Sequence, residues 1–146
     1  SCGAWSVDDR LHTVVEPGEA WVYFGGGEGA RGVRGTVDAG RVGRGGTLEA
    51  WAAQTSLRPA RAGFAVLSAS DFLYAFGGNQ GRPSSGGTSA DLRRSFPDVE
   101  NWNSLGTSLS TGRYLPGSAR ESAVVFVVGG ASDGASATRT VDWTNW

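Results

Sequence analysis

Residues Phe72–Gly78 have the sequence FLYAFGG, five apolar residues followed by two glycines. A short apolar run without polar alternation is typical of a β-strand that is buried on both faces. The glycine pair allows the backbone to turn sharply where a Cβ would clash. This stretch therefore predicts a central strand of a stacked sheet that ends in a tight turn.

The same pattern occurs twice more, as AWVYFGG at Ala20–Gly26 and as VVFVVGG at Val124–Gly130. Phe24, Phe76 and Val128 are spaced 52 residues apart. Self-similarity at a fixed period identifies a repeat protein, so we divide the chain into units of about 52 residues. The same offset links three threonines, two arginines and a Thr-Ser-Leu triplet: Thr36, Thr88 and Thr140; Arg61 and Arg113; Thr55–Leu57 and Thr107–Leu109.

Each unit is expected to contain four short strands. One strand follows the glycine-rich loop, and another runs into a tryptophan, as at Thr47–Trp51 and Val99–Trp102. The first strand of the next unit comes after that, as at Phe64–Leu67. Because no stretch shows sustained apolar spacing of about 3.6 residues, helix is expected to be nearly absent. The strand after the loop is predicted to start near Thr36, Thr88 and Thr140.

Four short strands in about 50 residues is the content of a β-propeller blade. The segment Gly45–Gly78 resembles the bacterial form of the kelch repeat, because it contains G-T-L-x-x-W, L-x-x-x-R and Y-x-x-G-G in that order, and the resemblance extends across essentially the whole chain. In the third copy, Leu115–Ala119 is poorly suited to strand pairing. Regulator-of-chromosome-condensation repeats, similar at His12-Thr13, are an alternative that also implies a propeller.

The fold class implied by the resemblance is all-β, with kelch-type β-propeller blades in three four-stranded repeats that make half of a six-bladed ring. The chain is expected to be a single module, residues 1–146, with units at about 6–51, 52–102 and 103–146. Three blades are too few, since propellers have about four to eight. Residues 1–5 are predicted to be a closing strand, because Cys2–Trp5 resembles Glu49–Trp51.

The predicted partner is a second copy, whose closing strand would complete the last blade and cover an edge that otherwise invites aggregation. The third unit reaches Trp146 without its own tryptophan-bearing fourth strand, which the closing strand would replace. The alternatives are that another propeller chain completes the ring, or that this chain is a fragment of a longer propeller.

Several classes of site are not expected. The net charge is −1, which gives no electrostatic footprint for nucleic acid. One histidine and one cysteine are too few for a zinc or copper site, so no metal or other cofactor is predicted. Gly25–Ala30 superficially matches a dinucleotide-binding loop, but poor helix formers follow it. No apolar run reaches the roughly 18 residues of a membrane span.

The recurring aromatic and basic residues are interpreted as structural. Trp51 and Trp102 occupy equivalent places, which predicts packing between blades, and Arg61 and Arg113 are expected to make structural hydrogen bonds. The pair Trp143 and Trp146 matches no repeat position; it is expected to cap the unfinished blade or, alternatively, to anchor a partner.

Function in a propeller is expected in the loops, because the strands are committed to packing. The leading hypothesis is a non-catalytic module that binds a protein or glycan, or assembles through its blade edges. The alternative implied by the kelch resemblance is a sugar-active enzyme similar to a sialic-acid mutarotase. The resemblance also implies an extracellular or cell-envelope location. The predicted ligand-contacting residues are Glu28, Arg31, Arg34, Asn79, Gln80, Arg82, Asp133 and Arg139.

Overall fold

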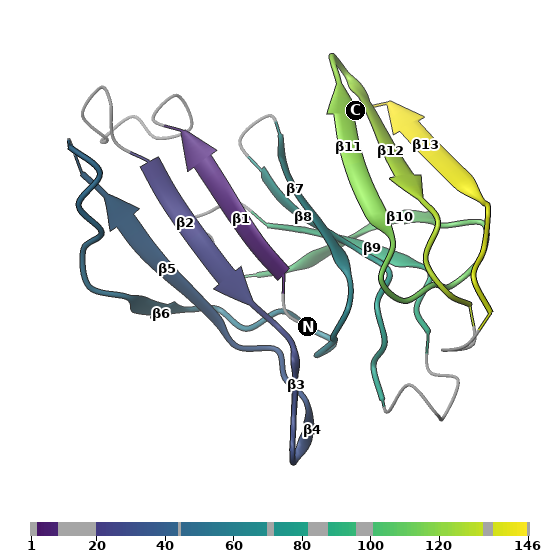
Figure 1. Ribbon diagram of the computed structural model, residues 1–146, viewed down its shortest axis with the longest axis horizontal. Helices are drawn as coiled ribbons and strands as arrows, with labels where there is room; N and C mark the ends of the chain where they lie inside the picture. The colour runs from purple at the N-terminus through teal and green to yellow at the C-terminus, as the bar shows by residue number, and fades with distance from the viewer. Residues whose placement is uncertain are drawn as a thin grey trace.

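The protein is built from β-strands. The computed structural model describes residues 3–8, 20–43, 45–69, 72–81, 88–95, 101–132 and 136–145. These residues form antiparallel sheets, and no helix among them could span a membrane. The three larger sheets stand side by side along an arc that is open on one side (Figure 1). This arrangement confirms the all-β fold with propeller-like blades.

Each larger sheet is one blade. Blade 1 pairs its strands in the order β1 (Gly3–Asp8), β2 (Ala20–Gly25), β5 (Val37–Val42) and β6 (Ala52–Gln54). Blade 2 pairs β7 (Ala65–Ala69), β8 (Phe72–Phe76), β9 (Asp91–Ser95) and β10 (Asn103–Ser108). Blade 3 pairs β11 (Gly117–Glu121), β12 (Val124–Val128) and β13 (Val141–Asn145). A small hairpin, β3 (Glu28–Gly29) and β4 (Gly32–Val33), projects from blade 1.

The first strands of the three blades line the inside of the arc. Strand β7 contacts both β1 and β11, while β6 and β10 lie at the outer ends of their sheets (Figure 1). Within the described residues blade 3 has three strands, so the fourth strand that the repeat predicts is not among them. Strand β13 is therefore the last strand of its sheet in the described part of the chain.

Two hydrophobic clusters join the blades. In the first, Tyr23 and Ala39 of blade 1 pack with Leu73 and Ala75 of blade 2. In the second, the opposite face of blade 2 packs through Tyr74 and Phe76 on Val125 and Val127 of blade 3. Both faces of β8 are buried, as its uninterrupted apolar sequence predicts for a strand between two sheets.

The structure shifts the register of the first repeat by one residue. The two consecutive positive φ angles fall at Gly26 and Gly27 (+68° and +106°), and they match Gly77 and Gly78 (+65° and +93°). The structural offset from blade 1 to blade 2 is therefore 51 residues and not the predicted 52. Since a slip of one residue turns every side chain of a strand to the other face, Tyr23 corresponds to Tyr74 and points toward the next blade.

The predicted fourth strand of blade 1 lies too early in the chain, while that of blade 2, Val99–Trp102, lies partly outside the described residues. In blade 1 the segment Thr47–Trp51 forms only an isolated bridge, from Leu48 to Val42, because a tight turn brings it back along the end of β5. The strand itself, β6, starts directly after Trp51, and β10 starts directly after Trp102. Each tryptophan thus precedes the fourth strand.

The expectation that Leu115–Ala119 would pair poorly is wrong. Strand β11 pairs with β12 at five consecutive positions, from Gly117 opposite Val128 to Glu121 opposite Val124. Pro116 lies immediately before the strand, where its missing N–H removes no bond of the ladder.

The predicted closing strand also has a different place. Gly3–Asp8 pairs along its whole length with β2 of the same chain, with Trp5 opposite Tyr23. It is thus the innermost strand of blade 1, equivalent to β7 and β11, because pairing there satisfies the inner edge of β2. Residues 3–5 are therefore not a separate strand that completes the last blade of a partner.

The packing between blades predicted for the recurring tryptophans is confirmed for Trp102 and wrong for Trp51, which is 47% exposed on the side of blade 1 that faces away from blade 2. The Trp102 side chain is 9% exposed in the first cluster, and its Nε1–H donates to the Thr55 carbonyl at 3.2 Å. We expect Trp102→Phe to lower the free energy of unfolding by about 1–2 kcal/mol, because the partly buried carbonyl loses its donor.

Urea unfolding followed by circular dichroism would measure this loss. The matched control is Trp51→Phe, at an indole that is 47% exposed, and its expected effect is within about 0.5 kcal/mol. Equal losses in the two variants would contradict the assignment of Trp102 as an interblade contact.

Candidate functional site

Two arginines connect the glycine turns of neighbouring blades. Gly27 N–H donates to the Arg61 carbonyl at 2.9 Å, which joins blade 1 to the segment leading into β7. The Arg61 side chain then donates through Nη1 to the Gly77 carbonyl at 2.8 Å. One residue therefore connects the turn of one blade with the turn of the next, and its side chain is fully buried.

Arg113 repeats this arrangement between blades 2 and 3. Its carbonyl accepts from Gly78 N–H at 2.8 Å, and its Nη1 donates to the carbonyls of Gly129 at 3.4 Å and Thr140 at 3.0 Å. The guanidinium is fully buried, and burial lowers the pKa of Arg113. The structural hydrogen-bonding role predicted for both arginines is confirmed.

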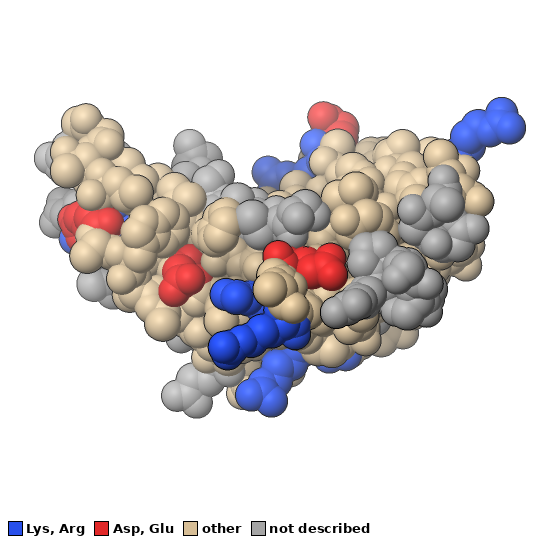
Figure 2. All heavy atoms as spheres, turned by 60° about the horizontal axis from the view of Figure 1, so that its bottom comes forward, with Lys and Arg blue, Asp and Glu red and all other residues tan. Residues whose placement is uncertain are grey.

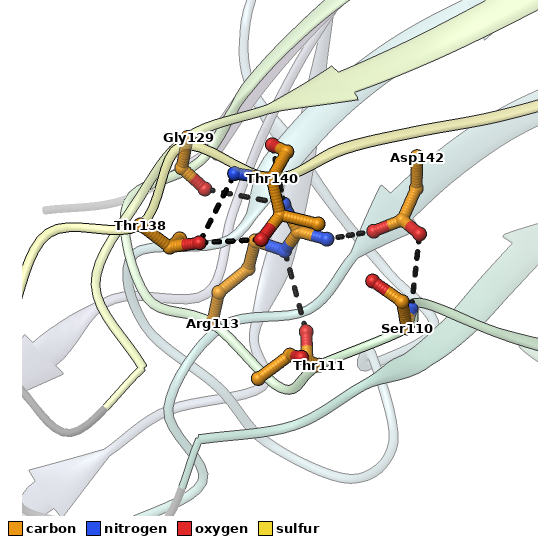
Figure 3. Close-up of polar contacts among 7 residues, drawn as sticks. All are labelled: Ser110, Thr111, Arg113, Gly129, Thr138, Thr140 and Asp142. Carbon is orange, nitrogen blue, oxygen red and sulfur yellow. Dashed lines mark hydrogen bonds and ion pairs between the residues drawn. The ribbon is translucent and has the colours of Figure 1, made fainter.

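Asp142 adds an ionic partner at the second junction. Figure 3 shows the Arg113 guanidinium between the carbonyls and the Asp142 carboxylate, with which Nη2 forms an ion pair. The other carboxylate oxygen accepts from Ser110 N–H at 3.1 Å. These groups satisfy one another, so the network holds two blades together and is not an open ligand site.

The structure brings part of the predicted site together on blade 1. Glu28, Arg31 and Arg34 lie on or beside the β3–β4 hairpin, and all three are exposed. Glu28 and Arg34 line an open groove of about 500 Å³ together with Thr36 and Asp38. Figure 2 shows basic side chains beside acidic ones on this side of the molecule, so the surface offers polar contacts of both signs.

Asn79 is not a surface contact. Its side chain is 1% exposed, its backbone pairs with Ala62 in both directions, and its Oδ1 accepts from Gly81 N–H at 2.8 Å. The residue after a glycine pair has the same role in blade 3, where Ala131 pairs with Tyr114. Asn79 therefore belongs to the framework of the junction.

The other predicted loop residues are dispersed. Gln80 is exposed and lines a second open groove, of about 700 Å³, with Thr88 and Arg93. Arg139 is exposed and lines neither groove. Arg82 and Asp133 lie outside the described residues. Among the described residues there is also no cluster of three or more His, Cys, Asp or Glu side chains that could hold a metal ion.

The outer face of blade 3, which points away from blade 2, is apolar and exposed. Val128 is 45% exposed, whereas Phe76 at the equivalent position of blade 2 is fully buried. Val141 pairs opposite Val128 and is 52% exposed, and the nearby Trp143 is 67% exposed. We refer to Val128, Val141 and Trp143 as the outer face of blade 3.

Blade 1 has a corresponding outer face, which we define by Phe24, Leu48 and Trp51. Phe24 is 46% exposed, while its structural equivalent Ala75 is fully buried. Leu48 and Trp51 cover Gly40 on the same side of the sheet, and each is 47% exposed. The sequence singled out Trp143 but not the rest of these two faces, because the other residues are as apolar as the buried ones that they match.

No family model and no curated protein matches the sequence. The solved structure of YjhT, a β-propeller, matches 99% of this chain with a TM-score of 0.68 at 18% sequence identity. The fold is a β-propeller. The match covers 45% of YjhT, so this chain spans less than half the length of that protein.

Proposed function

We propose that this chain is a kelch-type half-propeller that acts as a non-catalytic binding and assembly module, and that a second copy completes its ring. The observation that carries the proposal is the exposure of the two outer faces. Positions that blade 2 buries against its neighbours are open in blades 1 and 3. Contiguous exposed apolar side chains of this kind mark an interaction surface.

A second copy fits these faces without a further type of contact. Each blade interface inside the chain has the same two sides. The face that carries Tyr74, or its equivalent Tyr23, packs on the face of the next blade that carries Val125 or its equivalent Leu73. The outer face of blade 3 corresponds to the face of blade 2 that carries Tyr74, and the outer face of blade 1 corresponds to the face of blade 2 that carries Leu73. Two copies related by a two-fold axis would form this junction twice and close a six-bladed ring, within the range of about four to eight blades.

Charge and length are compatible with this assembly. The chain carries a net charge of only −1, so two copies repel one another weakly. YjhT, which has the same fold, is more than twice as long as the part matched by this chain. The open grooves beside Glu28 and Gln80 would then be the places where the ring binds a protein or glycan.

Sedimentation velocity of the purified chain over micromolar concentrations tests the proposal. We expect a particle of two chains. The double variant Phe24→Asp and Val128→Asp would place a charge on each outer face, and its dissociation constant is expected to rise by at least about tenfold, or about 1.4 kcal/mol. The control variant Arg31→Asp places the same side chain at the tip of the β3–β4 hairpin and should remain a dimer.

A wild-type chain that stays monomeric at all these concentrations would overturn the self-association. A pure chain that forms the ring only when mixed with a different propeller chain would do the same. Far-ultraviolet circular dichroism of the double variant separates loss of assembly from loss of fold, because the dissociated chain keeps its β-sheet signal only if the blades remain folded.

A further inference from the structure

The two junctions that blade 2 makes with its neighbours differ in charge. Between blades 2 and 3, the buried Arg113 guanidinium forms an ion pair with Asp142. Asp142 lies opposite Val127, which packs toward blade 2. The equivalent of Val127 in blade 2 is Ala75, which packs toward blade 1, and the residue opposite Ala75 is Arg93. On the face that each blade turns to the preceding one, blade 2 therefore carries a basic side chain where blade 3 carries an acidic one.

Blade 1 agrees with blade 3 at this position. Asp38 lies opposite Phe24 and ends the segment Thr36–Asp38, whose sequence Thr-Val-Asp recurs at Thr140–Asp142. The segment of blade 2 at the same place in the ladder is Asp91–Arg93, with the sequence Asp-Leu-Arg. The reversal of charge therefore distinguishes blade 2 from the other two blades.

Arg93 lines the open groove of about 700 Å³ that also contains Gln80. Among the described residues that line this groove there is no aspartate or glutamate. The charged group that these residues present is thus a guanidinium, and the Gln80 amide adds a neutral donor. The remaining lining residues are Pro59, Gly81, Thr88, Ser89 and Ala90.

A second guanidinium lies behind the wall of the groove that Pro59 forms. Arg61 Nε donates to the Pro59 carbonyl at 3.3 Å, and the Arg61 side chain is fully buried. At the other junction the carboxylate of Asp142 offsets the charge of the equivalent arginine, whereas here Arg93 adds a second positive charge. Charges near low-dielectric walls interact more strongly than charges in water, so the two cations favour an anion in the groove.

A buried amide lies next to the same groove. Asn79 directly precedes Gln80 and forms a bridge with Thr88, and both of these neighbours line the groove. Asn79 is 1% exposed, and its Nδ2 has no hydrogen-bond partner among the described residues. Because buried N–H groups are nearly always paired in native structures, this amide favours an acceptor at the groove.

We propose that the groove beside Arg93 is a receptor for an oxyanion, the carboxylate or phosphate group of a ligand. This inference rests on the proposed binding function and gives the ligand class of one of its two grooves. The planar Arg93 guanidinium would hold two oxygens of the anion, since its fork of donors matches both groups. All the lining residues lie between Pro59 and Arg93 of one chain, so the receptor does not depend on a second copy.

NMR spectra of the ¹⁵N-labelled chain, titrated with sodium phosphate and separately with sodium malonate, test this proposal. Sodium chloride keeps the ionic strength constant, so that general screening does not contribute. We expect saturable shifts at the backbone amides of Gln80, Gly81 and Arg93 with at least one of the two anions. The anion that binds more tightly shows whether the receptor prefers a phosphate or a carboxylate. Absence of saturable shifts with both anions, or shifts centred away from the groove, would overturn the proposal.

Two variants with the same change of charge make the test specific. Arg93→Gln is expected to weaken binding of the preferred anion by at least about tenfold, because it removes the charged donor. The matched control is Arg94→Gln, at the next residue, whose guanidinium lies over the Phe72 ring at 4.7 Å from the centroid. Phe72 packs in the second cluster, toward blade 3, so this control should change the affinity by less than about twofold. Equal losses in the two variants would show that net charge alone accounts for binding, which would overturn the receptor.

A charge reversal at Arg93 provides a third variant. Arg93→Asp places in blade 2 the residue type that blades 1 and 3 have at this position, and its carboxylate should pair with Arg61 as Asp142 pairs with Arg113. We therefore expect the variant to keep a folded NMR spectrum and to lose anion binding. Anion binding as tight as in the wild type would contradict the assignment of Arg93.

The Phe24→Asp and Val128→Asp variant separates this proposal from self-association. The preferred anion is expected to bind this variant and the wild type with affinities that agree within about twofold, because neither residue lines the groove. Anion binding by a wild-type chain that stays monomeric would overturn self-association and support the receptor. A dimer that binds neither anion would do the reverse.

Discussion

Replacing Arg113 by methionine is expected to lower the free energy of unfolding by about 3–5 kcal/mol, the usual cost of removing one partner of a buried ion pair. The side chain is fully buried and binds the carbonyls of Thr111, Gly129 and Thr140 as well as Asp142. Methionine fills a similar volume but donates no hydrogen bond. Because single domains are stable by only about 5–15 kcal/mol, we expect this variant to unfold at a much lower urea concentration than the wild type.

Urea unfolding followed by circular dichroism would measure this effect. Arg139→Met makes the same chemical change at an exposed position and should alter the stability by less than about 0.5 kcal/mol. The double variant Arg113→Met and Asp142→Leu should recover part of the loss, since it removes the unpaired carboxylate. A loss below about 1 kcal/mol for Arg113→Met would contradict the structural role of the network.

Replacing Gly78 by alanine is expected to destabilise the protein by about 2–5 kcal/mol, the sum of a backbone cost and a steric one. The φ angle of Gly78 is +93°, a backbone conformation that residues with a side chain rarely adopt. An added Cβ would lie 2.8 Å from the Phe64 Cβ and 2.9 Å from the Ala62 carbonyl oxygen. Neither neighbour can move freely, because the Ala62 carbonyl is paired with Asn79 and Phe64 is packed in the first cluster.

Gly45→Ala separates the two costs. Its φ angle is +87°, yet an added Cβ would meet nothing within 4 Å. We therefore expect this control to show only the backbone cost, about 1–2 kcal/mol. The midpoint of thermal unfolding of the two variants would be compared, and equal shifts would mean that the close approach of Gly78 to Ala62 and Phe64 contributes nothing.

Much of the fold could be predicted from the order of residues. The glycine pairs and the apolar runs before them locate β2, β8 and β12, because strand and turn preferences act over a few neighbouring residues. The recurrence of Arg61 and Arg113 predicted a shared structural role. Both side chains have that role, because each donates a hydrogen bond to a carbonyl of a glycine pair. Each of these inferences rests on a local pattern that occurs more than once.

The candidate site was less accessible to such reasoning. Asn79 was predicted to contact ligand because it follows a glycine pair in a variable loop, but its backbone is paired with a segment 17 residues away. Arg93, which lines the groove beside Gln80, was also missed, because it matches no recurring residue. The signal that could have found it is the triplet Thr-Val-Asp, which occurs at Thr36–Asp38 and Thr140–Asp142 but not in the second unit.

The sequence by itself therefore determined the repeat, the strands before its glycine pairs and the propeller fold, since each depends on neighbours along the chain. Only the tertiary structure decided that the first glycine pair acts at Gly26 and Gly27, one residue later than the alignment of repeats suggests. That register is set by Gly27 N–H and the Arg61 carbonyl, which are distant in sequence and meet only when two blades pack. The exposure of Phe24 and Val128 has the same origin, because it depends on which blade stands next to each face.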